Sequence, residues 1–210
     1  MRYYPIYLDL AHRPALVVGG GVIAEGKAEQ LIAAGAHLTI VSPTLTERLQ
    51  ALWQQDIFTY AQREFNVNDL TGVALVISAT DNQAVNEAVA AAAQARNLLY
   101  NIVDQVPLCN FITPALVTRG ELQITISTGG GSPSMAQLVK RQISELIGAE
   151  YEELLELAKW LRNELKARGV SYHDRRDLMN EFLSLELVAL LRDGNHAEAD
   201  RRALQVLANL

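Results

Sequence analysis

The chain has 210 residues, half of which are hydrophobic, and a formal net charge of −6 at pH 7. This length holds one α/β domain of about 110–150 residues and a smaller second unit. The acidic balance disfavours a general nucleic-acid-binding surface, and no apolar run reaches the roughly 18–20 residues of a membrane span. The first eight residues lack the long apolar core of a signal peptide. We therefore expect a cytoplasmic protein that binds neither nucleic acid nor a membrane.

The first predicted elements are a strand, a tight turn and a helix. The apolar residues 15–18 run into Gly19-Gly20-Gly21, and the next apolar positions, Ala24, Ala28 and Leu31, have helical spacing. A strand, a glycine turn and a helix in this order form the first part of a nucleotide-binding βα unit.

The glycine turn fits the pattern G-x-G-x-x-A through Gly19, Gly21 and Ala24. Gly19 allows the sharp turn, Gly21 lets the backbone approach a pyrophosphate, and Ala24 lets the helix pack closely on the strand. The alternative is a purely structural turn; the strand–helix context favours dinucleotide binding. The expected cofactor contacts, including those after two later strands, are Gly19, Gly20, Gly21, Val22, Ile23, Ala24, Ser42, Pro43, Thr80 and Asp81.

Strands and helices are predicted to alternate up to residue 103. Gly35 is the expected C-cap of the first helix. The remaining strands are predicted at residues 38–41, 57–60, 75–79 and 98–103, and the helices at 44–53 and 82–96. This alternation predicts a parallel sheet with right-handed crossovers.

The pattern changes after Asp104. Short apolar pieces at residues 111–117 precede a half-exposed strand at 122–126, where apolar and polar residues alternate. Ser132 as N-cap and Pro133 at the first helical position begin a helix to about residue 147. Further amphipathic helices are predicted at 151–168, 177–191 and 197–207. They indicate a small helical subdomain at the end of the chain.

Ligands of an open parallel sheet bind at the carboxyl ends of its strands. This rule selects Asp104, which follows the strand at 98–103, where a nicotinamide ring is expected. A carboxylate there serves as a general base or orients a proton donor, or else it caps a turn before Pro107. Its position alone does not distinguish a catalytic carboxylate from a turn cap. For Asp81-Asn82, which follows the strand at 75–79, a helix N-cap is the favoured reading.

A second glycine cluster, Gly129 to Gly131, leads into Ser132 and a helix N-terminus. This geometry suits an anionic group such as a carboxylate, and the alternative is a flexible connector. Lys140 and Arg141 on the following helix add positive charge or simply solvate its outer face.

Two further patterns bear on the cofactor and on metals. The strand at 38–41 is followed by Ser42-Pro43, which offers a hydroxyl for the ribose but no adjoining arginine for a 2′-phosphate, so NAD is expected. The single cysteine, Cys109, is expected to be a small buried hydrophobe. The four histidines have no i,i+4 histidine partner, so no preformed histidine metal site is expected: His12, His37, His173 and His196.

Taken together, these motifs resemble the precorrin-2 dehydrogenase family, the siroheme synthase component that also forms the N-terminal part of larger trifunctional enzymes. The resemblance is strong over about residues 1–150 and weaker beyond. The chain departs from the family at Gly26-Lys27, where members commonly have Arg before the Lys. The motifs that carry the resemblance are Pro5-Ile6-Tyr7-Leu8-Asp9-Leu10, Val17-Val18-Gly19-Gly20-Gly21, Lys27-Ala28, Ala79-Thr80-Asp81, Asn101-Ile102-Val103-Asp104, Phe111-Ile112-Thr113-Pro114, Ser127-Thr128-Gly129-Gly130 and Ser132-Pro133.

The resemblance implies a Rossmann domain at residues 1–112, a dimerisation region at 113–148 and a helical domain at 149–210. It implies NAD-dependent oxidation of precorrin-2 to sirohydrochlorin by a homodimer, with Asp104 as the catalytic residue that removes protons from the tetrapyrrole. Some members also insert ferrous iron to give siroheme; the macrocycle supplies the nitrogens, so no protein metal site is needed. The substrate's carboxylates call for N–H groups or cations, and the candidates are Arg119, Ser127, Thr128, Gly129, Ser132 and Lys140.

Two other functions are also compatible with the sequence. One is a dehydrogenase of another small acid, and the other is a nucleotide-sensing Rossmann module whose helices after residue 150 serve assembly. Replacement of Asp104 separates them, because only an enzyme loses turnover while it keeps NAD affinity.

Overall fold

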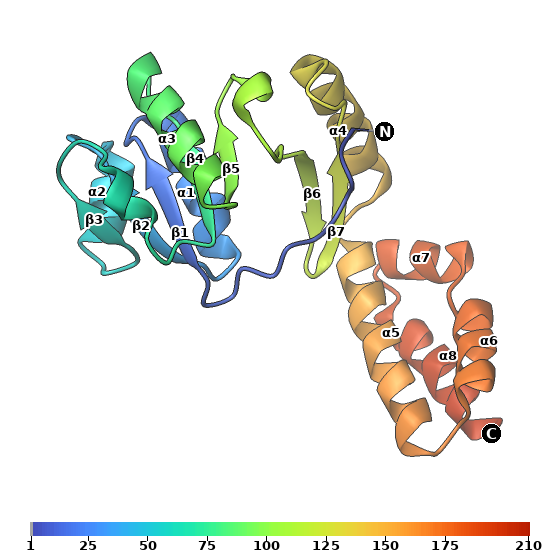
Figure 1. The fold of residues 1–210 in the computed structure, drawn as a ribbon. Coiled ribbons are helices and arrows are strands. Elements are labelled where there is room, and N and C mark those ends of the chain that lie inside the picture. Colours follow the sequence, from blue (N-terminus) through green and yellow to red (C-terminus); the bar gives the residue numbers. More distant parts are fainter. Residues whose placement is uncertain (1) are drawn as a thin grey trace. The chain divides into compact units, whose positions relative to one another are not determined.

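The computed structural model describes residues 2–210 and consists of two units, one up to Thr113 and the other from Pro114 to Leu210 (Figure 1). No helix among the described residues is long and apolar enough to cross a membrane. Each unit has its own hydrophobic core.

The first unit contains a five-stranded parallel sheet in the order β3-β2-β1-β4-β5. Its strands are β1 (Pro14–Val18), β2 (His37–Val41), β3 (Thr59–Ala61), β4 (Leu75–Ser78) and β5 (Leu99–Ile102). Its helices are α1 (Val22–Ala33), α2 (Glu47–Trp53) and α3 (Gln83–Ala95), with the 3₁₀ turns η1 (Val67–Leu70) and η2 (Val106–Leu108). The strand order reverses between β1 and β4, and in such sheets ligands bind at the carboxyl ends of the strands at this point.

Both faces of this sheet are buried, because alternate residues of each strand point to opposite sides. Ala15 and Val17 of β1 pack in the cluster that contains Ala24, Ala28 and Leu31 of α1. Leu16 and Val18 pack in a second cluster with Val89 and Ala93 of α3. Such double coverage explains the continuous apolar runs of β1 and β4.

The second unit joins a hairpin to a set of helices (Figure 1). Strands β6 (Ala115–Arg119) and β7 (Leu122–Ile126) pair antiparallel. The helices are α4 (Pro133–Leu146), α5 (Glu150–Ala167), α6 (Tyr172–Phe182), α7 (Leu185–Arg192) and α8 (His196–Ala208). Leu161 and Leu165 of α5 pack with Leu187 of α7 and Ala199 and Ala203 of α8 in its core.

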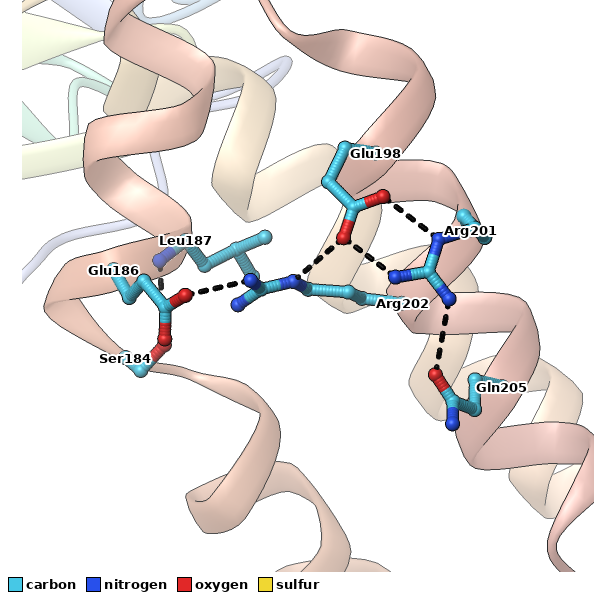
Figure 2. A network of polar contacts seen from close by, with 7 residues as sticks. All are labelled: Ser184, Glu186, Leu187, Glu198, Arg201, Arg202 and Gln205. Atoms are coloured by element: carbon cyan, nitrogen blue, oxygen red, sulfur yellow. Dashed lines mark hydrogen bonds and ion pairs between the residues drawn. The ribbon is translucent and has the colours of Figure 1, made fainter.

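An ion-pair network joins α7 to α8 on the surface of the second unit (Figure 2). Arg202 contacts Glu186 at 2.6 Å and Glu198 at 3.2 Å, and Arg201 contacts Glu198 at 2.6 Å. The hydrogen bonds from Arg201 and Arg202 lower the pKa of Glu198 to about 2. The Glu186–Arg202 pair links α7 to α8, and ionised Glu198 holds both arginines within α8.

The predicted fold class, a Rossmann-type parallel sheet followed by a small region and C-terminal helices, is confirmed. Ala34, not the expected Gly35, is the C-cap of α1; Gly35 is the next residue, with φ +74°, and ends the helix as glycine commonly does one position after the C-cap. The expected helix at 44–53 begins only at Glu47, because the Thr46 side chain caps it. A single helix at 177–191 was wrong: α6 ends at Phe182, and the Ser184 hydroxyl accepts from Leu187 N–H to begin α7.

Candidate active site

Gly19 forms the sharp turn after β1. Its φ is +115°, and its N–H donates to the carbonyl of Val41 at 2.9 Å. A Cβ at Gly19 would lie 2.3 Å from the carbonyl oxygen of Ala79, which follows β4. Only glycine therefore allows the loops after β1 and β4 to pass each other this closely.

Gly20 packs against the loop after β2. A Cβ at Gly20 would lie 2.0 Å from the Thr44 carbonyl oxygen. The Gly20 carbonyl accepts from Thr46 N–H at 3.0 Å, and the Thr46 hydroxyl donates to the Glu25 carboxylate at 2.5 Å. These contacts fix the glycine turn, the start of α1 and the loop that carries Ser42 and Pro43 as one rigid assembly.

Gly21 is the N-cap of α1, and no side chain caps this helix end. The Gly21 carbonyl accepts from Glu25 N–H at 2.9 Å, so the preceding N–H groups of Val22, Ile23 and Ala24 lie ahead of the intrahelical ladder. A Cβ at Gly21 would meet nothing within 4 Å. This open space in front of free N–H groups fits the pyrophosphate of a dinucleotide. Ala24 is fully buried, as close packing of the helix on the sheet requires.

Ser42 and Pro43 continue from β2. Ser42 is buried; its N–H donates to Ala61, and its carbonyl accepts from the Tyr60 hydroxyl at 2.9 Å. Burial raises the pKa of Tyr60, which keeps that hydroxyl a donor. Arg48, the nearest arginine in sequence, pairs with Glu29 at 2.9 Å. The surroundings of Ser42 thus favour an unphosphorylated ribose.

A buried network holds the loop after β4. The Ser78 hydroxyl donates to the Asn86 side-chain oxygen at 2.7 Å, and the Asn86 amide donates to the Thr80 carbonyl at 3.0 Å. Ser78 and Asn86 are both buried. Asp81 is exposed, and Asn82 caps α3 by accepting from Val85 N–H, so the expected N-cap at Asp81-Asn82 falls on Asn82. Sequence reasoning missed Asn86, although an amide among the alanines of α3 was a visible signal.

Asp104 follows β5 at the same edge of the sheet. Its backbone is left-handed, with φ +60°, and its side chain is exposed. The chain beneath it is held by Asn101, whose amide donates to the Phe111 carbonyl at 3.0 Å. Cys109 is buried, its thiol lies 3.2 Å from the Ile102 carbonyl, and burial raises its pKa, so it behaves as the expected buried hydrophobe.

Lys27 is a second residue that sequence reasoning did not place in the site. Its ammonium donates to the Thr113 hydroxyl at 2.7 Å. Burial lowers the pKa of Lys27, and the negative charge of Asp104 partly offsets that effect. The lysine and the predicted catalytic carboxylate therefore interact electrostatically within the first unit.

The other predicted contacts belong to the second unit. Ser132 caps α4 by accepting from Met135 N–H, Thr128 exchanges hydrogen bonds with the Ser132 backbone, and the Ser127 hydroxyl accepts from Gly129 N–H. Arg119 donates to the carbonyls of Ile147 at 2.8 Å and Ser144 at 3.0 Å. Its guanidinium thus caps the carboxyl end of α4. The loop at residues 127–132 precedes the opposite end of this helix, and Lys140 is half-buried in the middle of it.

Two family models match the chain. Residues 6–115 match the family described as "Putative NAD(P)-binding", and residues 119–146 match that described as sirohaem biosynthesis protein central. Among curated proteins, siroheme synthase 1 of Pectobacterium atrosepticum is 38% identical over 209 residues, and siroheme synthase of Nitrosomonas eutropha is 34% identical over 210. Both alignments cover 100% of this chain and 44% of the relative, so the chain spans less than half the length of these relatives.

A solved structure described as SirC, precorrin-2 dehydrogenase, superposes with a TM-score of 0.84 at 26% identity. The match covers 99% of this chain and 100% of that one. These matches confirm the resemblance to precorrin-2 dehydrogenases and siroheme synthases. Since the first family model covers more than half of the residues, this chain belongs to the NAD(P)-binding family that the model describes.

Proposed function

We propose that this chain is an NAD-dependent dehydrogenase that oxidises precorrin-2 to sirohydrochlorin. The observation that carries the proposal is the exposed carboxylate of Asp104 at the sheet edge that also bears the glycine turn. The full-length likeness to the precorrin-2 dehydrogenase SirC supports the substrate.

We give separate tasks to the residues of this edge. The first-turn N–H groups of α1 and the open space at Gly21 hold the dinucleotide pyrophosphate. Bound NAD supplies the hydride acceptor. Asp104 removes the proton that must leave the tetrapyrrole when a hydride is lost, and then releases it to solvent. The left-handed backbone at Asp104 fixes where this carboxylate stands relative to β5.

The carboxylates of the substrate need hydrogen-bond donors in a chain with a net charge of −6. We assign this role to the loop before α4 and to Lys140, with Ser127, Thr128, Gly129 and Ser132 presenting the helix N-terminus. Arg119 contributes indirectly, because its donors hold the carboxyl end of α4.

Assembly, iron insertion and location extend the same proposal. We propose that the chain divides into a domain at 1–112, a dimerisation region at 113–148 and a helical domain at 149–210. The dimerisation region contains the two-stranded β6–β7 sheet, whose strand edges can pair with a second copy. Ferrous iron is a further substrate in this proposal, with Asp104 accepting the pyrrole N–H protons that iron replaces. The cytoplasm, where NAD is plentiful, is the proposed compartment.

Replacement of Asp104 by Asn tests the function directly. The amide keeps the size of the side chain but cannot accept the proton, so NADH formation from NAD and precorrin-2 should be lost. NAD affinity, measured by calorimetry, should stay within about twofold, because the glycine turn is untouched. Undiminished turnover in the variant would show that Asp104 is not the catalytic base. If the parent protein has no turnover, and NAD changes the conformation of parent and variant equally, the protein is better explained as a sensor.

A further inference from the structure

Lys27 is a half-buried cation with one hydrogen-bond acceptor among the described residues. It lies in the second turn of α1, where its ammonium has three donors, and the Thr113 hydroxyl accepts one of them at 2.7 Å. Among the ion pairs of residues 2–210, none includes Lys27. Because Lys27 is half-buried, its ammonium is partly desolvated and gains from an anionic partner.

The surroundings of Lys27 indicate what would compensate it. Burial lowers its pKa, and the Asp104 charge offsets this only in part. Thr113 supplies only a neutral hydroxyl, so the ammonium has donors left for hydrogen bonds to an anion. A carboxylate-bearing ligand that approaches Asp104 meets a like charge there, and Lys27 is the cation placed to balance it.

The proposed reaction brings two kinds of anion to this unit, the pyrophosphate of NAD and the carboxylates of the substrate, and different elements contact each. The dinucleotide pyrophosphate is held by the first-turn N–H groups ahead of Glu25, on the side of α1 that Thr46 and the loop after β2 contact. Lys27 instead contacts the segment that runs from β5 to Thr113. It therefore belongs with Asp104 and the reacting substrate rather than with the phosphates.

We propose that Lys27 binds a carboxylate of the tetrapyrrole beside Asp104 and so orients the macrocycle toward this base. The inference rests on the proposed function, which names the polycarboxylate substrate. Lys27 becomes a substrate-binding residue, and the charge of its ammonium, not its contact with the neutral Thr113 hydroxyl, is what binds the carboxylate.

The test compares Lys27→Gln, Lys27→Arg and Thr113→Val in the full chain. Sirohydrochlorin binding is measured directly by absorbance titration, and NAD binding by calorimetry. We expect Lys27→Gln to weaken sirohydrochlorin binding and raise KM for precorrin-2 by about tenfold or more, as loss of a charge-assisted hydrogen bond implies. NAD affinity should not change, and Lys27→Arg should restore most of the binding.

Thr113→Val is the matched control, because it removes the neutral acceptor and keeps the cation. A loss much smaller than that of Lys27→Gln supports binding by charge. Equal losses in both variants, or an unchanged KM in a folded Lys27→Gln protein, would overturn the inference. If the parent protein neither binds sirohydrochlorin nor oxidises precorrin-2, the proposed function itself fails, which is a distinct outcome.

Discussion

Alanine replacements along the glycine turn should separate cofactor binding from stability. The three glycines are adjacent, yet a Cβ meets a different environment at each. At Gly19 it would lie 2.3 Å from the Ala79 carbonyl oxygen, at Gly20 it would lie 2.0 Å from the Thr44 carbonyl oxygen, and at Gly21 it would meet nothing within 4 Å. The open space at Gly21 therefore leaves room for a ligand beside the first-turn N–H groups of α1.

Gly19→Ala should lower the free energy of unfolding by about 2–4 kcal/mol. A non-glycine residue at a φ of +115° costs about 1–3 kcal/mol. Relief of the contact with Ala79 also requires a backbone shift that weakens the 2.8 Å bond from Ala79 N–H to the Val18 carbonyl, worth about 1 kcal/mol. Gly20→Ala should likewise destabilise the fold, because it displaces the loop at Thr44.

Gly21→Ala should behave differently. Its φ of −82° suits alanine, so the cost is about 1 kcal/mol at most, from a poorer N-cap. The added methyl group projects into the open space at the start of α1, so NAD affinity should fall more than tenfold, or about 1.4 kcal/mol.

Urea unfolding and NAD calorimetry on the same samples measure both quantities. Gly26→Ala is the matched control, since its Cβ also meets nothing within 4 Å but lies inside α1. It should stabilise the helix by about 0.5–1 kcal/mol and leave NAD affinity unchanged. A folded Gly21→Ala protein that binds NAD as tightly as the parent would refute the placement of the pyrophosphate.

Two further predictions concern the networks in each unit. Asn86→Ala should lower the free energy of unfolding by about 2 kcal/mol, because the buried Ser78 hydroxyl and the Thr80 carbonyl lose their partner. Urea unfolding measures this loss, and Gln94→Ala on the exposed face of α3 is the control. Glu198, whose pKa falls from 4.5 to about 2 in the folded chain, should contribute stability that is complete above pH 4.5 and is lost as the pH falls toward 2. Acid unfolding followed by circular dichroism should show a shallower slope in this range for Glu198→Gln, and an unchanged slope would show that the network does not stabilise the helices.

The first unit was largely predictable because its signals are local. An apolar strand, a glycine turn and a small residue at Ala24 fix the βα unit through backbone sterics that few other residues satisfy. Helix starts at Asn82 and Ser132 followed from capping chemistry, which joins residues only three positions apart in sequence. Where one such cap was overlooked, at Ser184, two helices were taken for one.

Contacts between distant residues were not predictable in the same way. Lys27 and Thr113 are 86 positions apart, and nothing in either segment indicates the other. The hydrogen bonds of Arg119 were equally hidden: its charge indicated a possible substrate contact, and the structure shows that it bonds the carbonyls of Ser144 and Ile147. Charge predicts a capacity to bind, but tertiary packing decides which partner is bound.

The measurement that tests the central claim most directly is an anaerobic reaction of the purified chain with NAD and freshly generated precorrin-2. We expect NADH absorbance and the sirohydrochlorin spectrum to rise together, with one NADH for each sirohydrochlorin formed. Addition of ferrous iron to the same cuvette then tests metal insertion. Demonstrated NAD binding with no NADH formed from precorrin-2 would contradict the account.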